Sequence, residues 1–436
     1  MTTARSQRAQ QLEDALRTLV PSSPKRQSSS DQRWFNYYAG YADVFVEDVI
    51  AVLAGGTKTV LDPWNGAGTT TAAAARAGLR TIGLDINPAA VVIAKARLLM
   101  SDVAASLLPL ADDVVAHARQ RRDAADKSDL LLRWLDPSTA ISIRRLERSI
   151  STLMVSSEGC RMTTHGVIDE VSSLAALFYL ALFRTTRDLL GPFVASNPTW
   201  IRLRVDPADR LHMSFNALAK RLRANVLALQ EATIANEYPA ASKQPQVSLG
   251  SSAQIPLRGN SVGAVLTSPP YCTRIDYAVA TLPELAVLGY EWPEVQQLRT
   301  RLIGTPTMLT DKSESPIVGS DTLQKLMRRV KRHPSYAARS YYLPFYRQYF
   351  KSMSASLFEI DRVARGGSPV ILVVQDSWFK DVHVATPTII SELAESIGWR
   401  MISEHAFDVK TRAAAHPHRA TRRTSRAIEI VSVYST

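Results

Sequence analysis

Cysteine, long apolar runs and a secretion signal are all scarce or missing in this chain. Its 436 residues include only two cysteines, Cys160 and Cys272, so the sequence encodes no disulfide framework and no thiolate metal site. No apolar run approaches the roughly 18 residues that a membrane-spanning helix needs. The N-terminus, from Met1 to Arg5, lacks the apolar core of a signal peptide. We therefore expect a cytoplasmic protein without a membrane partner and without a bound metal.

Acidic residues are also in short supply relative to basic ones. The chain has 52 Lys and Arg against 40 Asp and Glu, which gives a formal net charge of +12. Hydrophobic residues make up 46% of the chain, enough for a core, and the length allows two or three domains. An excess of positive charge favours a polyanionic partner, although any one charge run can simply be a solvated face. Four segments are rich in basic side chains: residues 119–148, 202–223, 328–339 and 410–426.

A glycine-containing turn follows the first predicted strand, which ends at Asp62. The turn reads Pro63-Trp64-Asn65-Gly66-Ala67-Gly68-Thr69-Thr70 and leads into an alanine-rich helix predicted over residues 71–77. Its glycines allow close approach of the backbone to a ligand, and the helix start offers free N–H groups. The spacing lacks the third glycine of a dinucleotide-binding turn, because position 71 is Thr. An NAD-type Rossmann fold is the alternative interpretation of this segment.

A second acidic residue closes the next predicted strand, residues 80–85. Asp85 lies 23 positions after Asp62, and an acid at about this spacing binds ribose hydroxyls in adenosine-containing ligands. Asn87 and Pro88 follow, and Pro88 is suited to the first turn of the helix predicted over residues 89–99. The two strand ends together predict a nucleoside-binding site.

The most informative segment lies in the second half, where the apolar run 262–266 ends in Thr267-Ser268-Pro269-Pro270-Tyr271. Two consecutive prolines cannot donate hydrogen bonds to a sheet, so the chain must leave it in a stiff, extended form. That turn presents a hydroxyl, bare carbonyl oxygens and an aromatic ring together. These groups can hold a flat base by its amino group, whereas an ordinary structural turn is the plain alternative.

The two motifs together resemble those of DNA amino-methyltransferases, and the Ser-Pro-Pro-Tyr form resembles the cytosine-N4 branch. The resemblance implies a class I, Rossmann-like α/β fold with a mixed, mostly parallel seven-stranded sheet, helices on both faces and a largely helical insert. It also implies S-adenosyl-L-methionine as the cofactor. The implied catalytic residues are Ser268, Pro269, Pro270 and Tyr271. The implied cofactor-binding residues are Asp62, Pro63, Gly66, Gly68, Thr69, Asp85, Asn87 and, from the aromatic segment 33–41, Tyr38.

The sequence departs from that family pattern at one position and leaves the target open. Ser251 stands where many relatives carry an acid that holds the adenine ring. Cys272 follows the motif, but the Pro-Cys pair of carbon-5 methyltransferases is absent, so we expect it to line the pocket. Adenine-N6 methylation uses the same geometry, usually with Asp or Asn in place of Ser268. An RNA methyltransferase and a catalytically silent DNA-binding subunit are further alternatives.

The predicted organisation has four parts. Residues 1–30 form a helix and a mobile linker, and residues 31–100 form the cofactor half of the methyltransferase domain. Residues 101–240 are a helical insert with helices at 107–125, 138–152, 169–190 and 211–235, and we expect it to read the target sequence. Residues 241–436 form the catalytic half, with strands at 246–249, 369–374, 401–407 and 427–434 and DNA-contacting loops at 282–333 and 410–426.

Double-stranded DNA is the partner that these expectations share. A base inside the duplex is unreachable, so the target cytosine must be flipped into the pocket. We expect phosphate or pocket contacts from Arg274, Arg328, Arg329, Arg419, Arg422 and Arg423. The resemblance also implies a bacterial restriction-modification setting, a nucleoid-associated location and cognate restriction or defence proteins. An ion pair between Arg274 and Asp276 is the structural alternative for that part of the loop.

Overall fold

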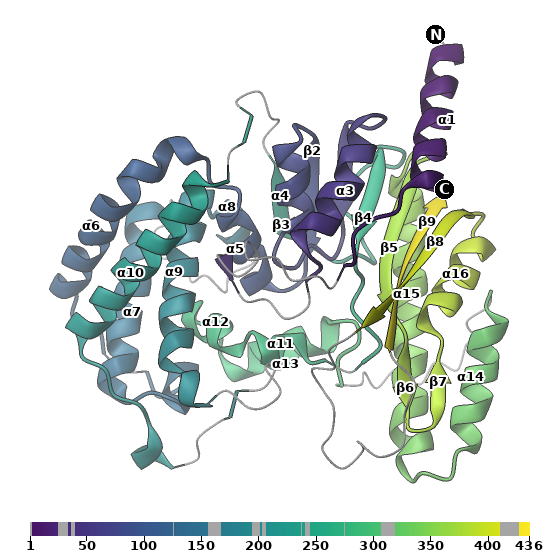
Figure 1. Cartoon of the computed structure of the whole chain (residues 1–436). Coiled ribbons are helices and arrows are strands. Elements are labelled where there is room, and N and C mark those ends of the chain that lie inside the picture. Colours follow the sequence, from purple (N-terminus) through teal and green to yellow (C-terminus); the bar gives the residue numbers. More distant parts are fainter. Residues whose placement is uncertain are drawn as a thin grey trace.

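A computed structural model of the chain is shown in Figure 1. It describes residues 2–24, 34–35, 40–124, 126–155, 167–193, 201–202, 206–236, 238–239, 245–273, 275–306, 319–409 and 427–436. Tyr38, Cys160, Arg274, Arg419, Arg422 and Arg423 lie outside the described residues, as do the predicted linker after residue 24 and the basic loop 410–426.

A seven-stranded mixed sheet forms the centre of the protein, in the order β3-β2-β1-β4-β5-β9-β8. The first five strands in that order are parallel, whereas β9 pairs antiparallel with both β5 and β8. This is the predicted Rossmann-like α/β fold with its mixed edge, and the prediction is confirmed. The strands are β1 (Thr59–Asp62), β2 (Arg80–Asp85), β3 (Gln246–Leu249), β4 (Ala264–Thr267), β5 (Pro369–Gln375), β8 (Arg400–Val409) and β9 (Ala427–Ser435).

Helices cover both faces of this sheet (Figure 1). One face packs against α1 (Thr2–Thr18), α3 (Asp43–Ala54) and α4 (Thr69–Arg76), and the other against α14 (Asp321–Arg332), α15 (Leu343–Val363) and α16 (Thr386–Ser396). Parallel strands buried on both faces need apolar side chains throughout. All residues of β1 and β4 are accordingly buried.

The helical insert packs on the β3 edge of the sheet through α5 (Pro88–Ala96). Every residue of α5 is buried, and Asn87 caps it by accepting a hydrogen bond from the Ala89 N–H at 3.1 Å. The Lys95 ammonium on this helix donates to the backbone carbonyls of Ile168, Asp169 and Val171 at 2.6–3.0 Å. The main insert helices are α6 (Leu107–Gln120), α7 (Pro137–Met154), α8 (Val167–Glu170), α9 (Ser173–Leu189) and α10 (Phe215–Ile234).

Three features differ from the sequence-based expectations for the insert and the catalytic half. The helix predicted over 169–190 is split, because the Ser172 side chain accepts from Ala175 N–H and starts a new helix. A short hairpin after β5, formed by β6 (Ser377–Phe379) and β7 (Val382–Val384), was not predicted. The stretch 282–333, predicted as a loop, is largely helical where it is described, with α12 (Leu282–Val287), α13 (Trp292–Arg301) and α14. Pro283 and Pro293 stand in the first turns of α12 and α13, where proline is compatible with a helix. A short helix, α11 (Tyr277–Ala280), precedes them.

The described residues contain neither a helix that is long and apolar enough to cross a membrane nor a cluster of three metal-binding side chains.

Candidate functional site

The two predicted motifs meet at the carboxyl ends of adjacent parallel strands. β1 pairs directly with β4, so the predicted cofactor loop (residues 62–70) and the Ser-Pro-Pro-Tyr loop (residues 267–271) leave the sheet side by side. The Thr267 hydroxyl donates to Asp62 Oδ1 at 2.5 Å across a sequence separation of 205 residues. The chain continues from β1 to β2 on one side and from β4 to β5 on the other side of the sheet. The carboxyl ends of two strands whose connections diverge in this way are where open α/β sheets bind ligands.

A second set of hydrogen bonds ties the same loops together. The Tyr41 hydroxyl donates to Asp62 Oδ2 at 3.2 Å and also hydrogen-bonds the Thr70 hydroxyl, which reaches the Leu266 carbonyl at 3.3 Å. Asp62 is buried, and burial raises the pKa of its carboxyl. Tyr41 lies in the aromatic segment that we singled out, but Tyr38 was the residue predicted there.

The glycines of the cofactor loop are required by its backbone. Gly68 has φ +81° and is the residue immediately before α4. A Cβ at Gly68 would lie 2.8 Å from Ala94 Cβ and 3.0 Å from Ala94 Cα, so α4 and α5 approach closely only because this side chain is missing. Gly66 also has a positive φ, +49°. The predicted positive φ is present at both glycines, whereas the close approach seen at Gly68 is to helix α5; approach to a ligand stays a prediction.

Asp85 organises the other wall of the cofactor loop. Its carboxylate accepts the Gly66 N–H at 2.8 Å through Oδ2 and the Asn87 N–H at 2.8 Å through Oδ1. Burial raises the pKa of this carboxyl to about 6, despite the opposing effect of the backbone hydrogen bonds. A carboxylate has about four acceptor positions, so both oxygens retain capacity for a further donor.

Three other predicted cofactor residues have structural partners of their own. The Asn87 amide donates to the Thr281 hydroxyl at 2.9 Å, in addition to capping α5. The Thr69 hydroxyl accepts from the Arg97 guanidinium at 3.2 Å. Pro63 is buried beside Asp62. Their roles toward a cofactor remain predictions.

One polar side chain in the cofactor loop has no partner. Asn65 is 4% exposed, and neither its Nδ2 nor its Oδ1 has a hydrogen-bond partner among the described residues. Its amide occupies the space next to Gly83, where a Cβ would come within 2.5 Å of it. A buried amide without partners is costly unless water or a ligand supplies them.

The Ser-Pro-Pro-Tyr loop is held from three directions. The Ser268 hydroxyl donates to the Val373 carbonyl on β5 at 3.0 Å, and its oxygen also lies within hydrogen-bond reach of the Tyr271 side chain. The Tyr349 hydroxyl on α15 donates to the Pro270 carbonyl at 2.8 Å. The Tyr271 N–H donates weakly to the Tyr277 hydroxyl at 3.4 Å. The loop is therefore held by side chains and a backbone carbonyl of neighbouring elements, and the Pro270 carbonyl is one of its own acceptors in this network.

Glu429 is a site residue that the sequence did not single out. It lies on β9, is fully buried, and accepts a hydrogen bond from the Tyr271 hydroxyl. Burial, together with the negative charge of Glu429, raises the pKa of Tyr271 well above its usual range. The only available signal was an acidic residue within an apolar strand, and such a residue is rarely buried without a partner.

A double-mutant cycle between Tyr271 and Glu429 should show that they act as a pair. Tyr271→Phe removes the hydroxyl donor from a buried carboxylate, which we expect to cost about 1–3 kcal/mol of unfolding free energy in urea. In a Glu429→Leu background the same change should cost much less, because no carboxylate remains to be satisfied. Additive losses would show that the hydrogen bond contributes nothing to stability.

Cys272 and Asp276, just after the loop, make contacts within the protein. Cys272 is buried in the core cluster that includes α15. Asp276 caps α11 through the Val279 N–H at 3.1 Å and forms an ion pair with Arg299 at 2.7 Å. Asp276 thus has a described basic partner in Arg299, while Arg274 is outside the described residues.

Two of the predicted DNA-contacting residues can be located. Arg328 and Arg329 lie on α14 and are both exposed. The position predicted for an adenine-binding acid is occupied by Ser251, whose hydroxyl accepts from the Ala253 N–H at 3.3 Å. The structure therefore offers no carboxylate at that position.

Comparison with known proteins gives distant, partial similarity to type II DNA methyltransferases. The chain is 28% identical over 147 residues to type II methyltransferase M.AvaI of Nostoc sp. (strain PCC 7120 / SAG 25.82 / UTEX 2576) and, equally, to that of Anabaena variabilis. It is 25% identical over 167 residues to type II methyltransferase M.BsoBI of Geobacillus stearothermophilus. These matches cover 31–34% of this chain and 30–33% of the relatives. No family model matches.

Proposed function

We propose that this protein is a DNA methyltransferase that transfers a methyl group from S-adenosyl-L-methionine to the N4 amine of a flipped cytosine. The observation that carries the proposal is the junction of the two loops at β1 and β4, fixed by the Thr267–Asp62 hydrogen bond. It supports the proposal because the loop that we propose for the cofactor and the loop that we propose for the amine leave the sheet at neighbouring strand ends. The partial similarity to type II methyltransferases supports the same activity.

The chemistry of the cofactor loop fits a nucleoside with a charged tail. The Asp85 carboxylate would accept hydrogen bonds from ribose hydroxyls, and the positive-φ glycines let the backbone approach closely. The buried, unpartnered Asn65 amide adds a donor and an acceptor to this loop. The bound cofactor would supply a methyl group on a sulfonium centre. The protein's own groups would hold that centre beside Ser268.

The Ser-Pro-Pro-Tyr loop would bind the amine and the ring of the base. The Ser268 hydroxyl already donates to Val373, so its oxygen can accept an amine N–H, as can the Pro269 carbonyl. These contacts draw the nitrogen lone pair out of conjugation and aim it at the methyl carbon. The amine would take the methyl group, the cofactor would leave as its neutral thioether, and the amine would release one proton to water. Positioning and electrostatics supply the rate enhancement, with Tyr271 stacked on the base.

Methyl transfer from labelled S-adenosyl-L-methionine to unmethylated duplex DNA tests the proposal. We expect label in the DNA and N4-methylcytosine among the nucleosides after digestion. Methyladenine in place of methylcytosine would assign the adenine-N6 reaction. Cofactor binding without transfer to any DNA, even with sequence-diverse substrates, would assign the silent DNA-binding subunit.

Cofactor affinity should depend on the ionisation of Asp85. Because burial raises the pKa of this carboxyl to about 6, the ionised form that accepts from ribose hydroxyls is lost as pH falls through 6. We expect the dissociation constant of S-adenosyl-L-methionine to increase below pH 6, and Asp85→Asn to bind weakly with no such pH dependence. Calorimetric titration between pH 5 and 8 measures both. A flat wild-type profile would exclude Asp85 as the ribose acceptor.

Stability provides an independent check with the opposite sign. The folded-state pKa of Asp85 is raised above its ordinary value, so the folded protein binds this proton more tightly than the unfolded chain. The contribution of Asp85 to unfolding free energy therefore increases as pH falls from about 6 toward 4. Subtracting the urea-unfolding profile of Asp85→Asn from that of the wild type isolates this contribution.

A further inference from the structure

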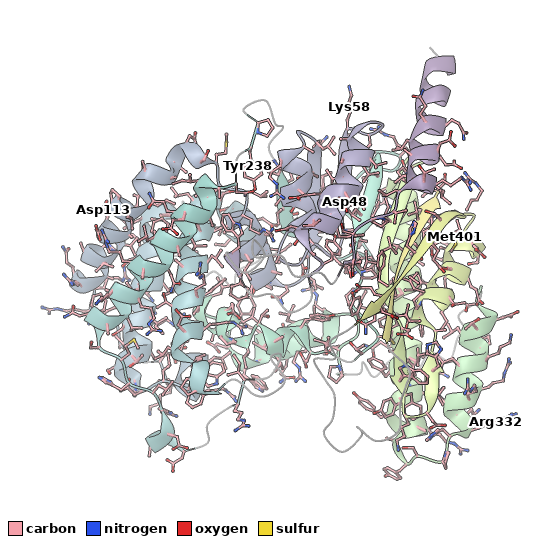
Figure 2. The ribbon with its side chains drawn as sticks, viewed as in Figure 1. Asp48, Lys58, Asp113, Tyr238, Arg332 and Met401 are labelled. Atoms are coloured by element: carbon pink, nitrogen blue, oxygen red, sulfur yellow. The ribbon has the colours of Figure 1, made fainter. Side chains whose placement is uncertain are left out.

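Helix α14 has one buried face and one cationic face. Leu323, Leu326 and Val330 are buried against the neighbouring helices α15 and α16. The helical period places four basic side chains on the opposite side, all of them exposed. These side chains are Arg328, Arg329, Lys331 and Arg332. Figure 2 labels Arg332, which extends outward from the edge of the molecule.

The four basic side chains form no ion pair among the described residues, although Asp321 lies in the first turn of α14 and Asp381 pairs with His333 at its end. Within the described part of the chain, none of the four has an acidic oxygen within 4.0 Å. Basic side chains in the last turn of a helix interact favourably with the negative end of its dipole. This accounts for their presence on α14 but not for their lack of acidic partners. The face therefore keeps a net positive charge that can interact with an external anion.

The basic residues of the helical insert differ in this respect. Several of them are already paired with acids of the insert itself. The pairs include Arg144–Asp129 at 2.7 Å, Arg148–Asp123 at 2.5 Å and Arg223–Asp112 at 3.0 Å. Asp113, labelled in Figure 2, adds an acid on the outer helix α6. An arginine that is paired with an acid attracts a phosphate less than an unpaired one. Ion pairing therefore distinguishes α14 from the helical insert, although both are rich in basic residues in the sequence.

The C-terminal end of α14 contacts the β6–β7 hairpin, which follows the strand next to the Ser-Pro-Pro-Tyr loop. His333 Nε2 lies 2.8 Å from Asp381 Oδ1, and the centroids of the His333 and Phe379 rings are 4.9 Å apart. The β6–β7 hairpin that carries both partners follows directly after β5, whose Val373 carbonyl accepts from Ser268. Eight residues separate Val373 from Asp381, at most about 26 Å of extended chain. This is less than the roughly 34 Å of one DNA turn.

Two further exposed side chains lie on the segments that adjoin the end of α14. Tyr336, just beyond α14, is 97% exposed, and Lys380 is exposed in the turn of the hairpin with φ +52°. Tyrosine and lysine side chains are both among those that contact phosphate and sugar oxygens of duplex DNA.

We infer that Arg328, Arg329, Lys331, Arg332, Tyr336 and Lys380 form a surface, the α14–hairpin surface, that binds the phosphate backbone of duplex DNA within one turn of the flipped base. The inference rests on the proposed function and specifies where that substrate is held. It makes this surface, and not the helical insert, the main source of sequence-independent affinity. Phosphate contacts position the duplex, so sequence can still be read elsewhere.

Two matched triple variants test the inference. Arg328→Gln/Arg329→Gln/Arg332→Gln removes three charges from α14, and Lys220→Gln/Arg221→Gln/Arg223→Gln removes three from α10, so both have the same net charge. Binding to fluorescent, sheared, unmethylated genomic DNA is measured from low to moderate salt. We expect the α14 variant to lose about tenfold or more in affinity, and its log–log salt slope to fall by about two to three. The α10 variant should remain close to wild type.

Cofactor affinity and thermal unfolding serve as folding controls for both variants. Equal losses in the two variants, or a larger loss in the α10 variant, would overturn the inference while leaving methyl transfer by the wild type intact. Wild-type DNA binding that depends on α14 but brings no methyl transfer would overturn the proposed activity and leave the surface supported. A wild-type protein that does not bind DNA at all would overturn both.

Discussion

Ser268→Ala should reduce methyl transfer to DNA by about 100-fold or more while leaving cofactor affinity unchanged. The side chain lies at the carboxyl end of β4, and its proton is committed to the Val373 carbonyl at 3.0 Å. Its oxygen is therefore held in place, beside the Tyr271 side chain, before the base arrives. Removing one preorganised group of this kind from a reacting centre typically costs a factor of about 100 to 1,000. Single-turnover transfer of labelled methyl groups measures the effect.

A serine-to-alanine change before the start of β4 provides the control. Ser261 precedes β4, is exposed in part, and its hydroxyl donates only to the nearby Arg258 carbonyl at 2.6 Å. Ser261→Ala should transfer methyl groups at the wild-type rate. Ser268→Ala itself loses one hydrogen bond, about 1 kcal/mol of unfolding free energy, so it should remain folded. Full activity in folded Ser268→Ala would remove this residue from the mechanism.

Gly68→Ala should lower the unfolding free energy by about 1–3 kcal/mol more than Gly78→Ala does, and it should abolish cofactor binding. Both glycines have a positive φ, +81° and +72°, which costs a side-chain-bearing residue about 1–2 kcal/mol. Only Gly68 faces a neighbour, Ala94 on the buried helix α5, at 2.8 Å from the new Cβ. Overpacking there adds about 1–3 kcal/mol and displaces the start of α4. Nothing lies within 4 Å of the corresponding Cβ at Gly78.

Urea unfolding and calorimetric cofactor titration of both variants distinguish the two contributions. Both variants introduce the same backbone strain. The difference between their unfolding free energies therefore measures the contact between α4 and α5. Equal unfolding free energies would mean that α5 shifts to accommodate the methyl group. In that case the close approach of the two helices would not be what requires glycine at position 68.

The Tyr271–Glu429 pair shows why one residue of the site was unpredictable. Tyr271 belongs to a contiguous motif, whereas Glu429 lies 158 positions later in an otherwise apolar strand. Its contact depends on β9 pairing antiparallel with β5, with Glu429 opposite Gln375. A strand's local pattern does not specify which neighbour it pairs with, and a shift of one residue would turn Glu429 to the other face.

The sequence by itself determined the elements that depend on local chemistry. Alternation of strands and helices predicted the parallel sheet, glycine spacing predicted the positive-φ loop, and the Pro269-Pro270 pair predicted where β4 ends. Each follows from backbone sterics or from periodicity within a few residues. The strand bounds 80–85 and 246–249 match the structure for the same reason.

Only the tertiary structure decided which of these elements meet. It joined Asp62 to Thr267, added Tyr41 and Glu429 to the candidate site, and linked His333 of α14 to the hairpin after β5. It also showed which arginines are paired internally, a property that composition does not contain. The physical reason is the same in each case: a hydrogen bond or ion pair is selected by strand order, register and burial of the whole chain, and not by the residues beside it.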